Sequence, residues 1–414
     1  MALLIRNLSQ IATPTGSGPS RGRAMRDLTV HEKSVMVIEG ERFAFIGRES
    51  DLPETLTITE DFDAKGATAL PGFVDSHTHI PFAGFRESEF NRRLQGETYE
   101  QIAAAGGGIA STVHATRKAS EAELVENVLT RTRTMARYGT TTAEAKSGYG
   151  LDRECELKQL RAIRTAAPQS PVRLVPTCLA AHEFPPESRG SEAARHGYLS
   201  TVIAEILPAV AEERLAAFCD VFVERGVFTR EQGEMVLRAG LELGMIPRIH
   251  ADELSDTDGA RLGAEVGAAS ADHLMYISDD GISALAASDT VANLLPATSF
   301  FLMSDRYAPA RAFIDRGAIV SLSTDCNPGS SMTESMQTVI QLATLRMKMT
   351  VEEALTAATL NGAYSLRLSS ETGSIETGKR ADFILLDAPN YLHLVYHFGV
   401  NLVTGVFRDG ARVG

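Results

Sequence analysis

The sequence has 414 residues, of which 44% are hydrophobic and 22% charged, a composition typical of a globular protein with room for two domains. Its formal net charge of −13 argues against a nucleic-acid-binding surface and against attraction to anionic membranes, and no run of about 18 apolar residues predicts a transmembrane helix. The cysteines at positions 155, 178, 219 and 326 form no C-x-x-C motif, which favours a cytoplasmic protein and argues against a disulfide framework or a cysteine zinc knuckle.

Both ends of the chain predict short β-strands separated by turns that contain glycine. Neither end is large enough to fold alone, so we expect residues 1–67 and 371–414 to pair into one small β domain. The strand-like runs on which this expectation depends are 34–38, 42–46, 381–387 and 401–407.

The middle of the chain, residues 68–370, alternates strand-like and helical patterns. A capping box, Ser120-Glu-Ala-Glu123, predicts the start of a helix that continues to about Tyr138 and ends at Gly139. The alternation predicts a parallel sheet in an α/β fold, and its length fits a (β/α)8 TIM-like barrel. A doubly wound open sheet is the alternative, but the Gly-rich loop that usually follows its first strand is absent. The expected strands are 69–80, 140–147, 172–183, 219–224, 246–253, 270–274, 291–296 and 318–325.

Ionisable side chains recur at the ends of these expected strands. His77 and His79 form a His-x-His pair on the first strand, where the period of two aims both imidazoles at the same face. The carboxyl ends of all barrel strands meet at one mouth, so these side chains are expected to converge there. Each alone could be an ordinary buried polar residue. The set is His77, His79, His182, His250, Glu253, His273 and Asp325.

Part of this set has the composition of a metal site. Three imidazoles and one carboxylate could form the first coordination shell of Zn²⁺, and Fe²⁺ or Fe³⁺ would also suit them. A catalytic metal in such a site activates a water molecule and polarises a carbonyl group. The expected metal ligands are His77, His79, His250 and Asp325.

The remaining members of the set could move protons. Glu253 could act as a general acid and base, although strict strand alternation favours Asp252, which shares the face of His250. His273 could hydrogen-bond the activated water or a developing oxyanion. Hydrolysis of an amide-like C–N bond is therefore the predicted reaction class.

Two further segments connect these observations to a known family. The run Pro71-Gly-Phe-Val-Asp75, just before the His-x-His pair, and residues 373–382 resemble the amidohydrolase superfamily. The resemblance implies a barrel with a composite β-sandwich domain built from both chain ends, and metal ligands on strands one, five and eight. It leaves open whether the strand-six histidine, His273 here, binds the metal or only its water. Binuclear members usually carry a carboxylated lysine on strand four. This sequence has no lysine there, and Lys146 falls on strand two, so we expect one metal ion per subunit, with Glu224 as an alternative bridging group.

Within the superfamily, the sequence is most similar to the imidazolonepropionases, enzymes of histidine breakdown. The similarity spans about residues 68–407 and is weak at 298–306. It implies hydrolysis of 4-imidazolone-5-propanoate, a cyclic amide, to N-formimidoyl-L-glutamate. The segments that carry it are 90–96, 105–109, 144–150, 270–274, 324–331 and 396–401.

The implied substrate has a propanoate tail, so this acidic protein needs a local cation. Arg86, after the first strand, could bind that carboxylate with two hydrogen bonds, or could be a surface residue paired with Glu87 or Glu89. The resemblance implies that Tyr149 and His182 contact the ring or its tail. It also implies a pocket lining from the turn after Asp325, which the Asn-Pro-Gly sequence would form in any case: Asn327, Gly329 and Ser330.

These residues suggest a division of labour. Asp325 or His273 would help to deprotonate the activated water, and His273 would stabilise the oxyanion together with the metal. Glu253 would orient the ring and move a proton to the leaving nitrogen. The family resemblance also allows a homodimer.

Two other functions compete with this interpretation. A deaminase of the same superfamily, acting on a purine, pyrimidine or related ring, would have the same scaffold. Arg86, Tyr149 and the turn at Asn327 favour a carboxylate-bearing substrate instead. An inactive relative that serves as an assembly protein would usually have lost metal ligands, and all four are present.

Overall fold

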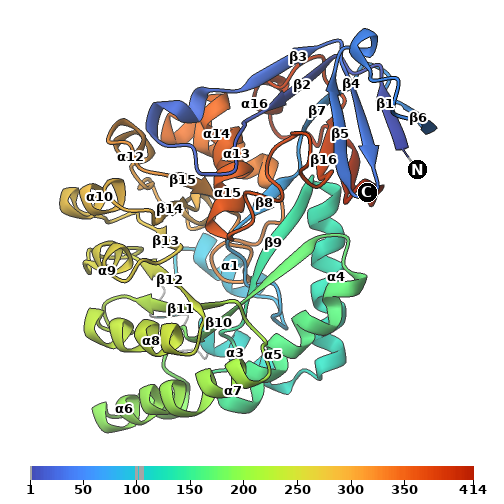
Figure 1. Cartoon of the computed structure of the whole chain (residues 1–414). Coiled ribbons are helices and arrows are strands. Elements are labelled where there is room, and N and C mark those ends of the chain that lie inside the picture. Colours follow the sequence, from blue (N-terminus) through green and yellow to red (C-terminus); the bar gives the residue numbers. More distant parts are fainter. Residues whose placement is uncertain (1, 98–100, 102–106) are drawn as a thin grey trace.

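The computed structural model describes residues 2–97, 101 and 107–414, and its centre is an eight-stranded parallel barrel (Figure 1). Positions 105 and 106 of the family-like segment 105–109 lie outside the described residues. The strands follow one another around the barrel in sequence order, which confirms the predicted (β/α)8 architecture. They are β8 (Phe73–Asp75), β9 (Thr140–Lys146), β10 (Arg173–Ala181), β11 (Phe218–Val223), β12 (Ile246–Ala251), β13 (Ser270–His273), β14 (Val291–Leu294) and β15 (Val320–Leu322).

The barrel closes just beyond the ends of its first and last strands. Thr78 and Cys326 form an isolated parallel bridge. The His79 N–H donates to the Cys326 carbonyl oxygen at 3.0 Å, and the Asp325 N–H donates to the His77 carbonyl oxygen at 3.1 Å. Three of the expected metal ligands therefore lie in the hydrogen-bonded seam that closes the barrel.

The first expected strand, residues 69–80, was placed wrongly at its start. Strand β7 (Thr68–Pro71) pairs with the C-terminal strand β16 (Phe383–Leu386), and only β8 belongs to the barrel. Pro71 has no N–H with which to continue the β7 ladder. The next N–H, of Gly72, donates to the Asp382 carbonyl oxygen, and that of Phe73 already donates to Gly139 in the barrel.

Helices surround the barrel and connect its strands (Figure 1). Several connections between consecutive barrel strands contain two or three helices, where the simplest (β/α)8 barrel has one. Before β12 they are α1 (Glu87–Leu94), α3 (Ile109–Lys118), α4 (Glu121–Arg137), α5 (Arg153–Ala166), α6 (Glu192–Thr201), α7 (Leu207–Glu212) and α8 (Arg230–Glu242). After β12 they are α9 (Gly259–Glu265), α10 (Asp279–Ala286), α11 (Pro296–Phe301), α12 (Ala310–Asp315), α13 (Met336–Met347), α14 (Val351–Ala358) and α15 (Leu360–Ser365). The short helix α16 (His393–Tyr396) follows β16 and connects no barrel strands.

Two smaller sheets lie beside the barrel and contain strands from both chain ends (Figure 1). They share a hydrophobic core in which Phe383 stacks on Phe407 with 4.4 Å between ring centroids, and Phe43 lies 5.9 Å from Phe383. The four-stranded sheet has the order β5 (Arg42–Gly47), β4 (Val35–Glu39), β1 (Ala2–Arg6), β6 (Ile58–Asp63). The six-stranded sheet has the order β18 (Ala411–Arg412), β17 (Val403–Arg408), β16, β7, β2 (Gln10–Thr13), β3 (Thr29–Glu32).

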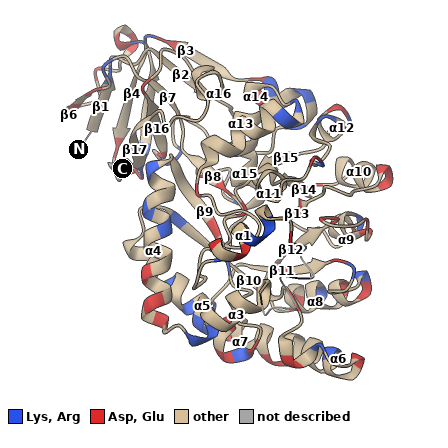
Figure 2. Cartoon of the chain, turned by 180° about the vertical axis from the view of Figure 1, so that it is seen from behind, with Lys and Arg blue, Asp and Glu red and all other residues tan. Residues whose placement is uncertain are grey.

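The helix predicted from the capping box at Ser120 is confirmed as α4. The Ser120 side chain accepts from the Glu123 N–H, and the Glu123 carboxylate accepts from the Ser120 N–H. Gly139 follows the last turn with a φ of +97°, a left-handed conformation that ends the helix. Acidic residues lie in the first half of α4 and basic residues in its second half (Figure 2), and an ion pair of 2.8 Å joins Arg133 to Glu126. None of the described helices is long and apolar enough to cross a membrane.

The capping box gives a test of the fold that leaves the barrel mouth untouched. Replacing Ser120 with Ala should lower the free energy of unfolding by about 1 kcal/mol, because the N–H groups of the first helical turn lose their side-chain partner. Urea unfolding measures this change. An unchanged midpoint would contradict the role of the cap. Ser50→Ala, in an exposed single turn of 3-10 helix at Glu49–Asp51, is the control.

Candidate metal centre and substrate cavity

The expected site residues lie around one cavity of about 530 Å³ at the carboxyl ends of the barrel strands. His77 is the one predicted site residue that does not line this cavity, and it lies directly behind His79. His273 and Asp325 adopt left-handed backbone conformations with φ of +80° and +55°. Such strain in residues other than glycine is concentrated at functional sites. The predicted residues in the lining are His79, Arg86, Tyr149, His182, His250, Glu253, His273, Asp325, Asn327, Gly329 and Ser330.

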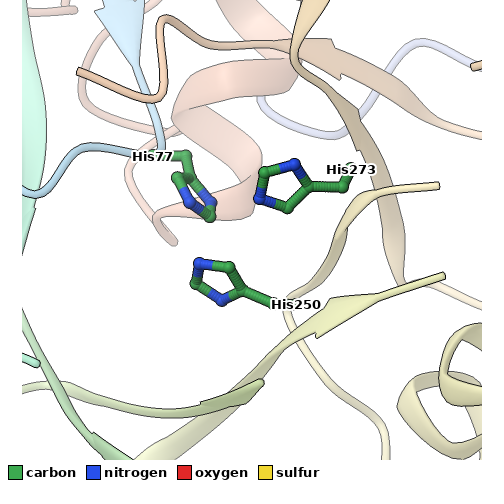
Figure 3. Close-up of side chains that lie close together, drawn as sticks. All are labelled: His77, His250 and His273. Carbon is green, nitrogen blue, oxygen red and sulfur yellow. The ribbon is translucent and has the colours of Figure 1, made fainter. Parts of the chain in front are cut away.

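The histidines and Asp325 form two overlapping groups with the composition of a metal site. His77, His250 and His273 point toward one another (Figure 3), and their ligand atoms lie within 4.8 Å of one another. His77, His79 and Asp325 form the second such group. Asp325 Oδ1 lies 3.5 Å from His77 Nε2 and 3.3 Å from His79 Nε2, and the two Nε2 atoms are 3.3 Å apart. The four expected ligands are thus divided between two groups that share His77.

The donor atoms present suit a metal ion. His250 Nε2 is buried and has no hydrogen-bond partner in the part of the chain that the structure describes. Buried polar atoms are rarely left unpaired, and an imidazole nitrogen beside other imidazoles and a carboxylate is the arrangement that Zn²⁺ and iron ions prefer.

Two carboxylates behind the histidines set the orientation of the rings. His77 Nδ1 lies 2.8 Å from Asp272 Oδ2, and His250 Nδ1 lies 3.1 Å from Asp220 Oδ2. A proton on each Nδ1 leaves the Nε2 lone pair free, as in known carboxylate–histidine–metal arrangements. Neither carboxylate was predicted from the sequence. The available signal was a single acidic residue within each of two buried strands, in β11 among apolar residues and in β13 directly before His273.

A network of fully buried ions supports these carboxylates. Lys146 Nζ lies 2.8 Å from Glu144 and 2.7 Å from Asp220. Arg248 lies 3.1 Å from Glu144 and 3.6 Å from Asp272. Burial would lower the pKa of Lys146, but the Asp220 and Glu144 carboxylates raise it above its ordinary value, so the ammonium stays charged.

Lys146 therefore lies beneath the histidines as a counter-ion, away from any bridging position. Glu224, the alternative bridging group, is also engaged elsewhere. It accepts hydrogen bonds from the Leu254 N–H at 2.8 Å and from the N–H and hydroxyl of Ser255, and it belongs to no candidate metal group among the described residues. Glu224 thus offers no bridging carboxylate. The other carboxylate of strand four, Asp220, belongs to a candidate group with His250 and Asp272, and it already contacts Lys146 and His250 Nδ1.

The choice between Asp252 and Glu253 is decided by the backbone. Asp252 has a φ of +51°, which breaks the strand alternation, and its carboxylate accepts from the N–H groups of Thr257 at 2.9 Å and Ala260 at 3.1 Å. It therefore holds the loop that leads into α9. Glu253 lines the cavity instead, with Oε2 3.6 Å from His273 Nε2.

Burial sets the protonation states of the site. It lowers the pKa of His79, His182 and His250 to about 4 in each case, so these rings are neutral near pH 7. Burial would raise the pKa of Asp325, but its contact with His79 and the neighbouring imidazoles lower it to about 2. Burial also raises the pKa of Glu253, which favours a protonated carboxyl group there. The site thus combines neutral imidazoles with one ionised and one protonatable carboxyl group.

Arg86 both pairs with a neighbouring glutamate and lines the cavity, the two alternatives that the sequence allowed. Its Nε donates to Glu89 Oε2 at 2.9 Å, and its guanidinium also lines the cavity. The Nη1 atom packs directly against Gly329, where any side chain would collide with it. Asn327 forms the expected turn, because its Oδ1 accepts from the N–H groups of Gly329 and Ser330 at 2.8 Å each. The turn and Arg86 therefore form one wall.

His182 and Tyr149 form another part of the cavity wall. His182 Nδ1 lies 2.9 Å from the Gly148 carbonyl oxygen, so Nδ1 carries the proton and Nε2 is an acceptor. The Tyr149 and His182 ring centroids are 5.3 Å apart, and the two rings meet edge to face. His182 also stacks beside His79 with 5.1 Å between centroids. A planar ring in the cavity would therefore meet both an acceptor and aromatic surfaces.

The chain is similar over its whole length to proteins named imidazolonepropionase. It is 46% identical to those of Porphyromonas gingivalis and Geobacillus sp., covering 100% and 99% of this chain and 97% of each relative. The chain belongs to the imidazolonepropionase family. The resemblance to the imidazolonepropionases is thereby confirmed, and a family model described as amidohydrolase family also matches residues 244–413.

Solved structures of more distant proteins share the fold. An adenosine deaminase from Xanthomonas campestris with bound zinc has a TM-score of 0.72 at 18% identity, covering 99% of this chain and 92% of that one. A triazine hydrolase variant has a TM-score of 0.76 at 16% identity, covering 99% and 94%. At these identities the similarity shows a common fold and carries no argument about function.

The lowered histidine pKa values predict a pH dependence for the metal-free protein. His79, His182 and His250 have a folded pKa of about 4 against an ordinary value of 6.5, so the unfolded chain binds more protons between these values. Their contribution to stability is complete above pH 6.5 and is lost as the pH falls toward 4. Urea unfolding after chelation should show this loss, at about 1.4 kcal/mol per pH unit for each histidine.

A matched pair of variants isolates the effect. His182→Gln should reduce the slope in this window, whereas His196→Gln, on the exposed surface of α6, should leave it unchanged. An identical slope for His182→Gln and the parent protein would contradict the assignment of a neutral, buried His182.

Proposed function

We propose that this chain hydrolyses 4-imidazolone-5-propanoate to N-formimidoyl-L-glutamate. The observation that carries the proposal is a single cavity that joins the histidine–aspartate cluster to the guanidinium of Arg86. A carboxylate-bearing cyclic amide matches both ends of that cavity. The full-length identity to imidazolonepropionases supports the same reaction.

We assign one metal ion per subunit to the cluster, held by His77, His79, His250 and Asp325. Zn²⁺, Fe²⁺ or Fe³⁺ would supply an activated water molecule and would polarise the ring carbonyl group. The support is the composition of the two overlapping groups and the unpaired Nε2 of His250. A third group of possible ligands, Asp220, His250 and Asp272, shares His250 with the first group, but its carboxylates contact the Nδ1 atoms of His77 and His250, so we assign no second ion to it.

The proton transfers follow from the protonation states. Asp325 is ionised and accepts a proton as the water attacks the ring carbonyl carbon. His273, 3.6 Å from Glu253, donates a hydrogen bond to the developing oxyanion. Glu253, which burial favours in its protonated form, delivers a proton to the ring nitrogen as the C–N bond breaks.

The substrate is oriented by groups around the cavity wall. Arg86 binds the propanoate tail, and His182 Nε2 accepts a hydrogen bond from a ring N–H. Tyr149 covers one edge of the ring beside His182. The turn that contains Asn327, Gly329 and Ser330 lines the pocket next to Asp325.

Three features beyond the site belong to the same proposal. Residues 1–67 and 371–414 would form a composite β-sandwich domain, with 68–370 as the catalytic barrel. The four free thiols, none paired in a disulfide, suit a cytoplasmic location. Exposed apolar side chains between positions 392 and 400 suit a homodimer contact: Leu392, Tyr396, Phe398 and Val400.

The reaction can be followed by the loss of imidazolone absorbance from freshly made 4-imidazolone-5-propanoate. We expect loss faster than spontaneous decay, and we expect a chelator to abolish it because the cluster then lacks its metal ion. Release of ammonia from guanine or cytosine, without imidazolone turnover, would contradict the proposal and favour a deaminase.

The role of Glu253 has its own test. Replacing Glu253 with Gln removes the proton donor but none of the assigned metal ligands, so kcat should fall by about a hundredfold or more while metal content stays unchanged. Glu242→Gln, on the exposed end of α8, is the matched control and should retain full activity. Loss of metal in Glu253→Gln would contradict the role as proton donor.

A further inference from the structure

Helix α1 presents one side to the substrate cavity and the other to solvent. Arg86, at its N-cap, and Glu89, Phe90 and Arg93 all line the cavity. Their spacing of three, four and seven residues places them on one helical face. Figure 2 shows acidic and basic stretches side by side on this helix. The charges that α1 offers to a ligand are therefore those of Arg86, Glu89 and Arg93.

The charge of Arg86 is already offset. Its Nε donates to Glu89 Oε2 at 2.9 Å. Glu89 also accepts from the Gly108 N–H at 3.0 Å and from the Ser111 hydroxyl at 2.9 Å. Partial burial opposes ionisation of Glu89, but these hydrogen bonds and Arg86 lower its pKa below the ordinary value, so the carboxylate stays charged. Arg86 can still donate from its other nitrogens, but the pair as a whole is neutral.

Arg93 has no such counter-ion. No carboxylate pairs with it in the part of the chain that the structure describes, and its buried Nε lacks a hydrogen-bond partner there. Two aromatic rings hold it instead, since its Cζ lies 5.4 Å from the centroids of both Phe90 and Phe301. Those rings stack with 4.7 Å between centroids and tie α1 to α11. A guanidinium held by rings and facing a cavity keeps its donors for a ligand.

We propose that Arg93 forms a carboxylate-binding subsite of the cavity and carries the net positive charge that selects a substrate with a carboxylate tail. Arg86 then contributes hydrogen bonds at the wall formed by Gly329, whereas Arg93 contributes charge. The proposal rests on the proposed function for the identity of the natural ligand. The subsite itself can be tested with any small heterocycle that bears a carboxylate.

Arg92 provides a matched control on the same helix. It is 33% exposed, and its Nε donates to Glu97 at 2.9 Å. It does not line the cavity. Replacing either arginine with Met removes one positive charge from α1 and keeps a flexible apolar side chain, but only Arg93→Met should affect the cavity.

The first experiment measures binding without turnover. Imidazole-4-propanoate and 4-propylimidazole have similar shape but differ in the carboxylate, and calorimetry gives the affinity of each for the metal-loaded protein. We expect the parent protein to prefer imidazole-4-propanoate, and Arg93→Met to lose about tenfold or more of its affinity for that ligand alone. Arg93→Lys should recover part of the loss, and Arg92→Met should match the parent.

The second experiment uses the reaction itself. With 4-imidazolone-5-propanoate, Arg93→Met should raise KM by a similar factor and leave kcat nearly unchanged, because the subsite lies away from the bond that breaks. Absence of turnover by the parent protein would overturn the proposed function, and the binding comparison would still decide the subsite.

Two results would overturn the subsite. The first is equal affinity of the parent protein for both imidazoles. The second is an Arg93→Met variant whose affinity for each imidazole equals that of the parent protein, or whose affinities for the two imidazoles fall by the same factor. Equal weakening would mean that Arg93 only packs against Phe90 and Phe301.

Discussion

The orientation of the candidate metal ligands depends on a fully buried ion network under the barrel mouth. Lys146 and Arg248 offset the carboxylates of Glu144, Asp220 and Asp272. Two of these carboxylates contact Nδ1 of His77 and His250 and so determine which ring nitrogen points toward the other ligands of the cluster. Removing one partner of such a network leaves an uncompensated buried charge, at a cost of about 3–5 kcal/mol. The network therefore couples the stability of the barrel to the geometry of the site.

The backbone adds a second constraint at the same place. The segments that carry His77, His79 and Asp325 hydrogen-bond to each other where the barrel closes, so these side chains are held by main-chain contacts from both sides. Left-handed conformations at His273 and Asp325 turn both side chains into the mouth. The groups proposed to bind the substrate come from other segments: the loop and helix after β8, the residues that follow β9 and β10, and the turn after β15. This separation lets the reaction centre stay rigid while the substrate wall is built from longer connections.

Periodic and local patterns were sufficient to predict much of this structure. The His77-x-His79 alternation, the strand-end rule of barrels and the capping box at Ser120 each depend on neighbours in sequence. Prediction failed where distant segments decide. The first expected strand was wrong at its start, because β7 pairs with the distant β16. Strict alternation alone would also have favoured Asp252 over the predicted Glu253, and the φ of +51° at Asp252 breaks that alternation. Asp220 and Asp272 have partners on other strands, and the register between strands is absent from any local pattern. Arg93 lies within the family-like segment 90–96, and only the three-dimensional structure shows that its Nε has no partner among the described residues.

The central claim is that residues from strands one, five and eight hold one metal ion in this barrel. Anomalous diffraction from crystals of the metal-loaded protein, recorded at the absorption edges of zinc and iron, tests it directly. The account predicts one anomalous peak per chain, with His77, His79, His250 and Asp325 as its ligands. A peak coordinated by His273 in place of Asp325, or two peaks bridged by a carboxylate, would contradict it.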